Sequence, residues 1–237
     1  MPQVTSIVAL IDHAVLHPTQ TCADVRAACG LCDRLGVASI CVKPSHVPLA
    51  AELLAGSAVK VSTVIGFPHG GTSTAAKAHE TTLACQSGAV EVDMVVNLGQ
   101  ALAGDWEYVA ADIAAVVEAA RAGGALTKVI LETGLLPDDA AKRRLCELSC
   151  QAGAAFVKTS TGFGYVKNDA GALVSTGATE HDIRLMRAAC PSTVGVKASG
   201  GIRSYEDAAK FVELGATRLG TSGAKAIAAG EPNTGDY

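Results

Sequence analysis

A short hydrophobic run ends at a lysine in the middle of this chain, in the sequence Phe156-Val157-Lys158-Thr159-Ser160-Thr161-Gly162-Phe163-Gly164. The residues before Lys158 predict a buried strand, and the hydroxyl residues and glycines after it predict a loop. A lysine at the end of a buried strand is costly to keep charged, so its pKa should fall and its amine should become a nucleophile. Alternatively, the side chain reaches solvent and keeps its charge. The rest of the chain bears on this choice.

Seven similar runs lie before and after this one, and longer alanine-rich stretches with helical periodicity separate them. The eight runs span residues 7–13, 39–42, 59–65, 90–97, 128–134, 156–158, 194–197 and 217–220. Parallel strands need crossover helices, and eight such units close into a barrel. An open doubly wound sheet is the alternative, but its glycine fingerprint is absent after the first run. We therefore expect an α/β fold, a single (β/α)8 TIM barrel, with one domain over residues 1–237.

The composition suits such a barrel and argues against several classes of protein. Hydrophobic residues make up 49% of the 237 residues and aromatic residues only 4%, which favours a core of Ala, Val, Leu and Ile over an aromatic β-sandwich. A net charge of −4 gives no basic surface for nucleic acid. The sequence has no secretion signal and no hydrophobic run of membrane-spanning length, so we expect a cytoplasmic protein without a membrane partner.

The eight cysteines do not indicate redox chemistry. Most lie in alanine-rich helical stretches, where cysteine behaves as a small buried hydrophobic residue. Cys29 and Cys32 have the C-x-x-C spacing, but they lie inside an expected helix rather than at its start, where the thiol pKa would be lowered. We therefore expect reduced cysteines.

In a barrel of this kind the chemistry takes place at the carboxyl ends of the strands. The residues at the ends of the runs include many charged groups: Asp12, Cys41 with Lys43, the loop 66–71, Asp93 with Asn97, Glu132, Lys158, Lys197 and Ser222. Lys158 and Lys197 end neighbouring runs, and their repulsion in a dry site would leave one amine neutral. With Asp93 for proton transfer, they predict a Schiff-base site for carbonyl chemistry.

The spacing alone does not decide which lysine attacks. Lys158 is followed by hydroxyl residues that could bind a substrate, and Lys197 by glycines that could bind an anion. Lys43 is a third candidate, but Pro44 follows directly, and we expect this lysine to point outward. The role of Glu132 is also open, either as a second acid or as an ion-pair partner of a lysine.

Two glycine-containing loops favour a phosphorylated substrate. Gly200-Gly201 follows the seventh run and Thr221-Ser222-Gly223 the eighth, where barrels commonly hold a phosphate. The six histidines do not form a recognisable metal motif. His13 and His17 flank a strand end and Pro18 instead of sharing a helix face, so we expect no metal site.

Six motifs at these strand ends resemble the deoxyribose-phosphate aldolase family, in order over nearly the whole chain. They are Leu10-Ile11-Asp12-His13, Ile40-Cys41-Val42, Glu91-Val92-Asp93-Met94-Val95-Val96-Asn97, Val129-Ile130-Leu131-Glu132-Thr133-Gly134, Val157-Lys158-Thr159-Ser160-Thr161-Gly162-Phe163 and Val196-Lys197-Ala198-Ser199-Gly200-Gly201-Ile202-Arg203. The last two are the most specific. The resemblance implies a class I aldolase that cleaves 2-deoxy-D-ribose 5-phosphate reversibly to D-glyceraldehyde 3-phosphate and acetaldehyde, in deoxyribonucleoside catabolism, without a metal or other cofactor.

The resemblance also implies roles for individual residues. By motif, Lys158 is the Schiff-base nucleophile, Lys197 the cation that lowers its pKa, and Asp93 the proton donor and acceptor, acting through water. Asp12, Cys41 and Thr161 are implied to line the sugar end of the site, and Gly200, Gly201 and Ser222 to hold the phosphate. Tyr237 matches by position a C-terminal tyrosine that is implied to assist proton transfer, although a disordered terminus is the alternative.

The chain departs from the family pattern at two places near Lys158. The loop over residues 165–178 is longer than the family leads us to expect, so it could form a lid or alter the choice of acceptor. Phe163 stands where some members have a lysine, and Lys167 could compensate for that lysine at the phosphate. The motif after Val42 also differs, with Lys43-Pro44 in place of Asn-Pro.

Two other functions remain as alternatives at this point. A metal-free phosphosugar isomerase or epimerase on this fold would use Asp93 and Glu132 as acid and base. A non-catalytic sugar-phosphate sensor would use the phosphate loops alone. For any of these we expect a homo-oligomer, a homodimer or homotetramer, because exposed hydrophobic helix faces of barrels often pair.

Overall fold

The barrel is seen in a computed structural model that describes residues 3–168 and 170–230. Its parallel strands are β1 Ile11–Val15, β2 Ser39–Val42, β3 Lys60–Ile65, β4 Glu91–Val95, β5 Leu126–Ile130, β6 Phe156–Lys158, β9 Gly195–Ser199 and β10 Arg218–Thr221. Strands β1 and β10 pair with each other and close the sheet, so the prediction of a (β/α)8 barrel is confirmed.

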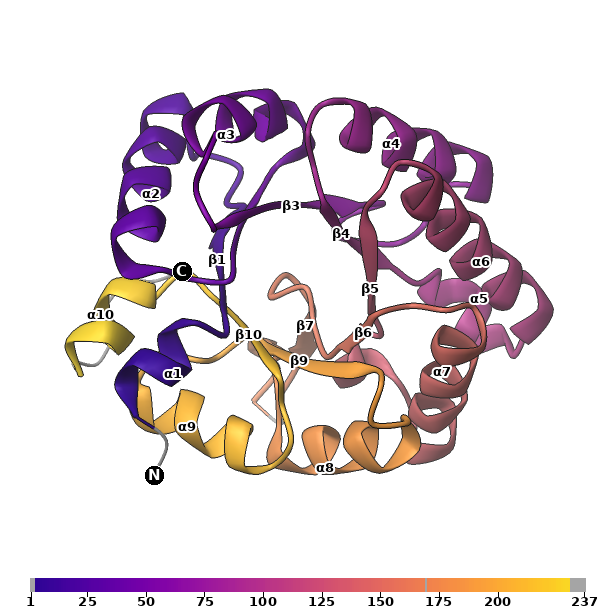
Figure 1. The fold of residues 1–237 in the computed structure, drawn as a ribbon. Helices are drawn as coiled ribbons and strands as arrows, with labels where there is room; N and C mark the ends of the chain where they lie inside the picture. Colours follow the sequence, from indigo (N-terminus) through magenta and orange to yellow (C-terminus); the bar gives the residue numbers. More distant parts are fainter. Residues whose placement is uncertain (1–2, 169, 231–237) are drawn as a thin grey trace.

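Helices surround the strands on the outside (Figure 1). They are α1 Val4–Val8, α2 Cys22–Leu35, α3 Val47–Leu53, α4 Thr74–Gln86, α5 Leu98–Ala103, α6 Trp106–Ala122, α7 Asp139–Gln151, α8 Glu180–Ala189, α9 Tyr205–Glu213 and α10 Ala224–Ala229, with 3-10 turns η1 Pro44–His46 and η2 Thr133–Leu135. Several start at the side-chain caps that the sequence signals; Ser204, for example, accepts from the Asp207 N–H. None of the helices in the described ranges is long and apolar enough to cross a membrane.

The local structure differs from the sequence-based expectation at one strand boundary and at one short helix. Residues 7–10 were expected to begin the first strand, but Ile7 and Val8 end helix α1, and β1 starts at Ile11. Helix α7 begins after its N-cap Asp138, whose side chain accepts from the Ala141 N–H. The short helix α5, capped by Asn97, was not predicted.

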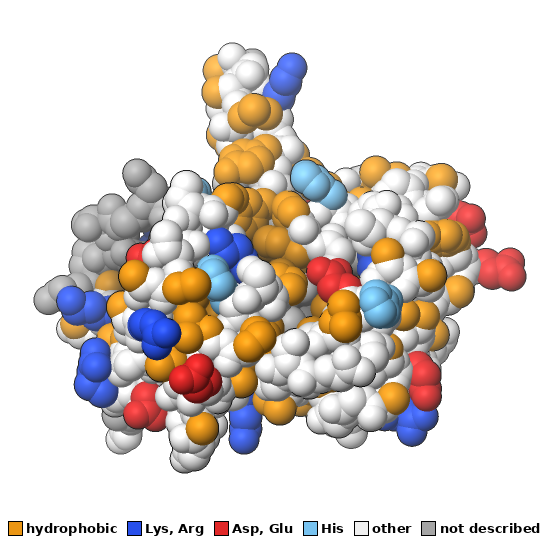
Figure 2. Space-filling view, turned by 90° about the horizontal axis from the view of Figure 1, so that it is seen from above, with side chains coloured by type: hydrophobic (Ala, Val, Ile, Leu, Met, Phe, Trp, Pro, Cys, Tyr) orange, Lys and Arg blue, Asp and Glu red, His pale blue; other side chains and the backbone are white. Residues whose placement is uncertain are grey.

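The long segment after β6 forms a β-hairpin. Strand β7 (Tyr165–Lys167) pairs antiparallel with β8 (Leu173–Ser175). The Asn168 side chain accepts hydrogen bonds from the backbone N–H groups of Ala170 and Ala172, which fastens the turn. The hairpin projects from the rounded body, with hydrophobic side chains along it (Figure 2).

The hydrophobic core lies between the strands and the helices, not inside the barrel. Outward-facing strand residues such as Ile11, Met94, Val129 and Val196 belong to it and are fully buried. Many inward-facing positions are instead polar or charged: Asp12, Ser39, Ser62, Glu91, Asp93, Lys128, Lys158 and Lys197 are all buried. A small separate hydrophobic cluster of Leu16, Cys41 and Val64 lies on the same side of the sheet. This departs from the layers of branched aliphatic residues usual in such barrels, and it places the ionisable groups in a dry interior.

Candidate active site

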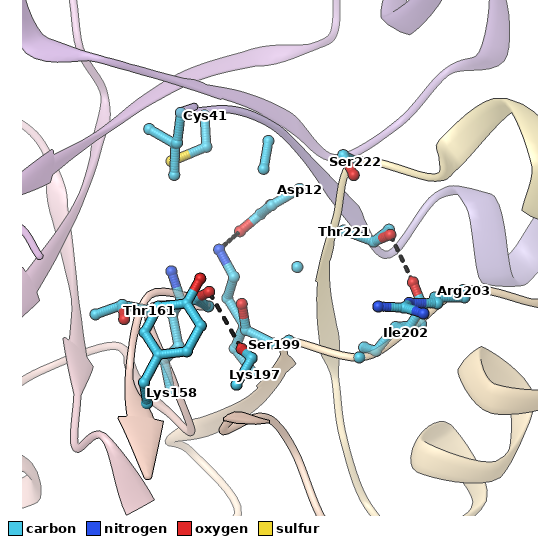
Figure 3. Close-up of a pocket in the computed structure, with 18 residues that line it drawn as sticks. Asp12, Cys41, Lys158, Thr161, Lys197, Ser199, Ile202, Arg203, Thr221 and Ser222 are labelled. Atoms are coloured by element: carbon cyan, nitrogen blue, oxygen red, sulfur yellow. Dashed lines mark hydrogen bonds and ion pairs between the residues drawn. The ribbon is translucent and has the colours of Figure 1, made fainter. Parts of the chain in front are cut away.

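Strands β6 and β9 place two lysines side by side. Lys158 and Lys197 are register partners in these neighbouring strands, and the two residues are 2% and 1% exposed. Both amines contact the same Asp93 Oδ2 atom, at 2.9 Å from Lys158 Nζ and 2.8 Å from Lys197 Nζ. Figure 3 shows both lysines at the cavity, with Asp12 and Lys197 pointing toward each other. The predicted meeting of Lys158, Lys197 and Asp93 is therefore present.

The two lysines differ in their surroundings. Burial lowers the pKa of Lys158, Lys197 adds to the lowering, and Asp93 opposes it only in part. Burial also disfavours the charged form of Lys197, but Asp12 and Asp93 outweigh it and raise the Lys197 pKa above its usual value. Lys197 Nζ lies 2.5 Å from Asp12 Oδ2. Lys158 is thus the amine that loses its proton more easily, which spacing alone did not decide.

Asp93 lies behind the lysines and does not line the cavity. Burial alone would raise its pKa, but Lys128, Lys158 and Lys197 hold that pKa well below its usual range. Lys128, which donates to Asp93 Oδ1 at 2.7 Å, was not singled out from the sequence. It is an inward-facing residue of β5 that lies two positions before the strand end. Reading inward-facing positions along each strand, and not only strand ends, would have found it.

One cavity of about 170 Å³ contains most of the candidate residues. Asp12, Cys41, Lys158, Thr161, Lys197, Gly200, Gly201 and Ser222 all line it, as do Leu16, Ser199, Ile202, Arg203, Thr221, Tyr165 and Ser175. This volume is below the range of about 300–1,000 Å³ of drug-sized ligand sites and suits a small metabolite. Burial raises the pKa of the Cys41 thiol, so this residue lines the cavity as a neutral group.

The end of the cavity that the sequence predicts to hold a phosphate is formed by the two glycines after β9. Gly200 and Gly201 have φ angles of +87° and +79°, and a Cβ atom on Gly200 would come within 2.9 Å of Gly177 Cα. Arg203 lines the cavity beside these glycines and supplies a cation that was not singled out (Figure 3). Lys167 does not line it and is exposed on the hairpin, so the suggestion that Lys167 replaces the missing lysine stays a prediction. The Phe163 ring packs edge-on against Phe67, with centroids 5.4 Å apart.

Glu132 fastens the loop that leads into the hairpin. Its carboxylate accepts from the Thr161 N–H at 3.1 Å and from the Thr161 hydroxyl at 2.5 Å. Its backbone is left-handed, with φ of +54°, which is rare for a residue other than glycine. Burial raises the Glu132 pKa, while the Thr161 hydrogen bonds lower it in part. No ion pair between Glu132 and a lysine is seen among the described residues, and Glu132 Oε1 is buried without a hydrogen-bond partner there. The role of Glu132 as a second acid stays a prediction.

The remaining candidates lie elsewhere. Lys43 Nζ donates to the carbonyl oxygens of His17, Pro18 and Gln20, so it holds a loop and does not point freely outward. Within residues 3–168 and 170–230, the histidines, cysteines and carboxylates form no cluster that could hold a metal ion. Burial raises the pKa of Cys32 to about 12, which agrees with an inert thiol. Tyr237 lies outside the described residues.

Comparison with known proteins places these features in a family. Residues 5–229 match the family model described as DeoC/LacD family aldolase. The chain is 47% identical over its full length to the deoxyribose-phosphate aldolase of Carboxydothermus hydrogenoformans, all of which is covered. It is 51% identical to that of Bacillus mycoides, with 94% of each chain covered. A structure described as tetrameric deoxyribose phosphate aldolase from Aeropyrum pernix superposes with a TM-score of 0.86 at 32% identity, covering 97% of this chain and 92% of the other. With a (β/α)8 barrel, two buried lysines that share one carboxylate, and these matches, the chain belongs to the DeoC/LacD family of aldolases.

Proposed function

We propose that this protein is a class I aldolase that cleaves 2-deoxy-D-ribose 5-phosphate reversibly to D-glyceraldehyde 3-phosphate and acetaldehyde, in deoxyribonucleoside catabolism. The observation that carries the proposal is the buried Lys158 amine, which opens into the cavity beside a charged Lys197. The two relatives described above, which match 100% and 94% of the chain, bear the name of this activity. The whole chain, residues 1–237, then serves as one catalytic domain.

Lys158 is the nucleophile in this proposal. A lysine attacks a carbonyl only as the free amine, and burial beside a second cation favours that form. Lys197 keeps its proton because it contacts both Asp12 and Asp93. The unequal surroundings of the two amines support attack by Lys158 and proton donation by Lys197.

The cleavage begins with attack of the Lys158 amine on the C1 aldehyde of the open-chain sugar. Loss of water gives an iminium ion, which draws electrons from the C2–C3 bond as the C3 hydroxyl loses its proton. Glyceraldehyde 3-phosphate leaves, and an enamine remains on Lys158. Protonation at C2 and hydrolysis release acetaldehyde and restore the amine.

The protons in these steps reach the cavity through Lys197 and water. Asp93 is covered by the lysines, so it accepts or returns protons through the groups it contacts, Lys158 and Lys197, at 2.9 and 2.8 Å. The cluster as a whole can thus take the C3 hydroxyl proton and return a proton to C2.

Gly200, Gly201, Ser222 and Arg203 form the phosphate end of the site in this proposal. They line the same cavity as Lys158, and glycine backbone with positive φ can approach an anion closely. The guanidinium of Arg203 suits a phosphate because its N–H groups match two oxygens.

An isomerase or epimerase is less consistent with these contacts. Such an enzyme would need two carboxyl groups facing one substrate carbon. Asp93 is hydrogen-bonded to three lysines, and Glu132 is hydrogen-bonded to Thr161. A sensor without catalysis would leave the neutral amine without a use.

Reductive trapping tests the aldolase. The protein is incubated with acetaldehyde and sodium borohydride, and the reduced adduct is located by peptide mass spectrometry. We expect an ethyl adduct on Lys158, and cleavage of 2-deoxy-D-ribose 5-phosphate by the untreated protein. If no lysine carries an adduct, the Schiff-base mechanism is excluded.

Two variants refine the test. Lys158→Leu should abolish trapping and cleavage, whereas Lys225→Leu, which removes an exposed lysine near the phosphate end, should retain both. Circular dichroism and thermal unfolding check that each variant is folded. Retained cleavage in Lys158→Leu with adduct on Lys197 would transfer the nucleophile to Lys197.

We also propose that the chain forms a homodimer or homotetramer. The Aeropyrum pernix relative is described as tetrameric, and this chain exposes Leu83 and Leu102 on its outer helices. Light scattering after size-exclusion chromatography should give a mass of two or four chains. A monomer at micromolar concentration would contradict this part of the proposal.

A further inference from the structure

A layer of three charged residues lies beneath the lysine pair, toward the amino ends of the strands. It consists of Glu91 on β4, Lys128 on β5 and Arg218 on β10, and none of them lines the cavity. Lys128 Nζ lies 2.7 Å from Glu91 Oε2, and Arg218 Nη1 lies 3.0 Å from the same atom. Lys128 and Glu91 are buried, and Arg218 is mostly covered, with its guanidinium over the Phe156 ring at 4.9 Å.

This layer is joined to the site through the two aspartates. Lys128 contacts Asp93 Oδ1 at 2.7 Å and Asp12 Oδ2 at 3.4 Å. Arg218 contacts Asp12 Oδ1 at 2.6 Å. The two oxygens of Asp93 therefore serve different groups, one Lys128 and the other the lysine pair at the cavity.

The connected cluster contains more cations than carboxylates. Lys128, Lys158, Lys197 and Arg218 face Asp12, Glu91 and Asp93, so full ionisation would leave one positive charge without a counter-charge. An uncompensated charge in a dry interior is costly, and the usual relief is loss of the proton from one group.

The contacts indicate which group that is. Among the described residues, Lys128 contacts three carboxylates, and Lys197 and Arg218 contact two each. Lys158 contacts one, Asp93. Deprotonation at Lys158 therefore sacrifices the fewest ion pairs.

We propose that Glu91, Lys128 and Arg218 are positioning residues that act as a charge-setting layer and determine that Lys158 is the neutral amine of the site. Residues of the layer form ion pairs with both Asp12 and Asp93. The negative charge that remains for Lys158 and Lys197 is too small to keep both of these lysines protonated. The proposal deepens the proposed aldolase function, on which its catalytic meaning rests.

The other groups that face Lys158 do not replace this layer. Asp93 faces it from β4, Lys197 from β9, Cys41 from β2, and Glu132 from the turn after β5. Cys41 is held neutral by burial, and the Glu132 carboxylate is directed to Thr161. The protonation state of Lys158 is thus determined by Asp93 and Lys197, and by the charged residues of the layer that contact Asp93 and Asp12.

The test measures the protonation of Lys158 without using substrate. Acetic anhydride acetylates only free amines, and peptide mass spectrometry gives the acetylation rate of Lys158 at each pH relative to exposed Lys225. The pH at which the Lys158 rate is half-maximal reports its proton affinity. This readout remains available even if the protein is not an aldolase.

Two near-isosteric variants should move this midpoint in opposite directions. Lys128→Met removes a buried positive charge, so Lys158 is protonated more readily and its midpoint rises. Glu91→Gln removes a negative charge, so the midpoint falls. Lys128 Nζ and Lys158 Nζ bond to one carboxylate and lie within about 8 Å, so we expect the Lys128→Met shift to be about one to two pH units.

Further variants separate charge from structure. Lys128→Arg keeps the charge and should restore the wild-type midpoint, and Arg218→Met should move it upward as Lys128→Met does. Shifts of opposite sign with restoration by arginine support the layer. Midpoints that stay within about 0.3 pH units, or that move the same way in Glu91→Gln and Lys128→Met, would overturn it.

The same variants separate this proposal from the proposed function. If the aldolase proposal holds, the acid limb of the borohydride-trapping rate should shift with the acetylation midpoint in each variant. If wild-type protein gives no trapped adduct while the acetylation midpoints shift as expected, the aldolase function fails and the charge-setting layer stands.

Discussion

His13 should make the protein sensitive to acid, and the size of the effect follows from its burial. His13 lies on β1 next to Asp12, is 7% exposed, and has a buried Nδ1 atom with no hydrogen-bond partner in the described part of the chain. Burial lowers its pKa from 6.5 to about 4. The imidazole is therefore neutral in the folded protein down to that pH.

The sign follows from proton binding in the two states. Below pH 6.5 the unfolded chain protonates His13 while the folded chain does not, so unfolding becomes more favourable as the pH falls. Below about pH 4 both states carry the proton, and this contribution levels off. The difference between the two pKa values corresponds to about 3 kcal/mol, most of it lost between pH 6.5 and 4.

The comparison of wild type with His13→Leu isolates this contribution. Urea unfolding gives the free energy of unfolding of both proteins at pH 7.5, 6, 5 and 4, and carboxylate effects common to both cancel in the difference. The advantage of wild type over His13→Leu should fall by about 3 kcal/mol from pH 7.5 to pH 4. His79→Leu, at an exposed position, is the matched control and should give a constant difference. A constant difference for His13→Leu as well would refute the reasoning.

Three other predictions concern the buried Lys77–Asp112 ion pair, Gly200 and the hairpin of β7 and β8. Lys77→Met should lower the free energy of unfolding by about 3–5 kcal/mol in urea titrations, because buried Asp112, 2.5 Å from Lys77 Nζ, loses its counter-charge. The double variant Lys77→Met with Asp112→Leu should recover most of this loss. A double variant as unstable as Lys77→Met would show that the unpaired Asp112 charge is not the cause. Gly200→Ala should raise KM for the phosphorylated sugar about tenfold, because the added Cβ would lie 2.9 Å from Gly177 Cα, while borohydride trapping of acetaldehyde persists. An unchanged KM would show that the phosphate does not bind at Gly200. Joining Gly164 directly to Thr176, whose N–H donates to the Gly164 carbonyl at 2.8 Å, should remove Tyr165 and Ser175 from the cavity wall and leave the barrel strands in place. KM for the acceptor aldehyde should then change more than the Lys158 trapping rate. Equal losses would show that the hairpin takes part in the chemistry.

Much of the fold was predictable because each strand–helix unit carries its own signals. The hydrophobic runs repeat eight times, and most of the helices between them carry a side-chain cap, as α4, α6, α7, α8 and α9 do. Errors at one boundary therefore do not alter the topology. The errors arose where a segment is short. Ile7 and Val8 look like the start of a strand, and the three-residue strands of the hairpin are too brief for alternation to be visible.

The site was predictable in the same measure. Lys158 ends β6, but Asp12 is the second residue of β1 and Lys197 the middle residue of β9, so they do not end their strands as expected. They still meet, because inward-facing residues of parallel strands converge in a closed barrel. Lys128 and Arg218 were missed because they stand at the start of their hydrophobic runs in the sequence, and their role depends on register and on which side chains share a carboxylate. Sequence spacing does not contain that information, since it emerges only when distant strands are paired.

The polar interior has a consequence for how this barrel could be redesigned. Its hydrophobic core lies outside the strands, so the charged cluster inside is not what holds the helices on. Buried ion pairs are often no more stabilising than well-packed hydrophobic residues of the same volume. A variant with methionine and leucine in place of all seven cluster residues should therefore keep the barrel, and could exceed the wild type in stability while losing every ionisable group at its centre. Such an empty scaffold would offer a dry cavity in which a different set of charges could be installed.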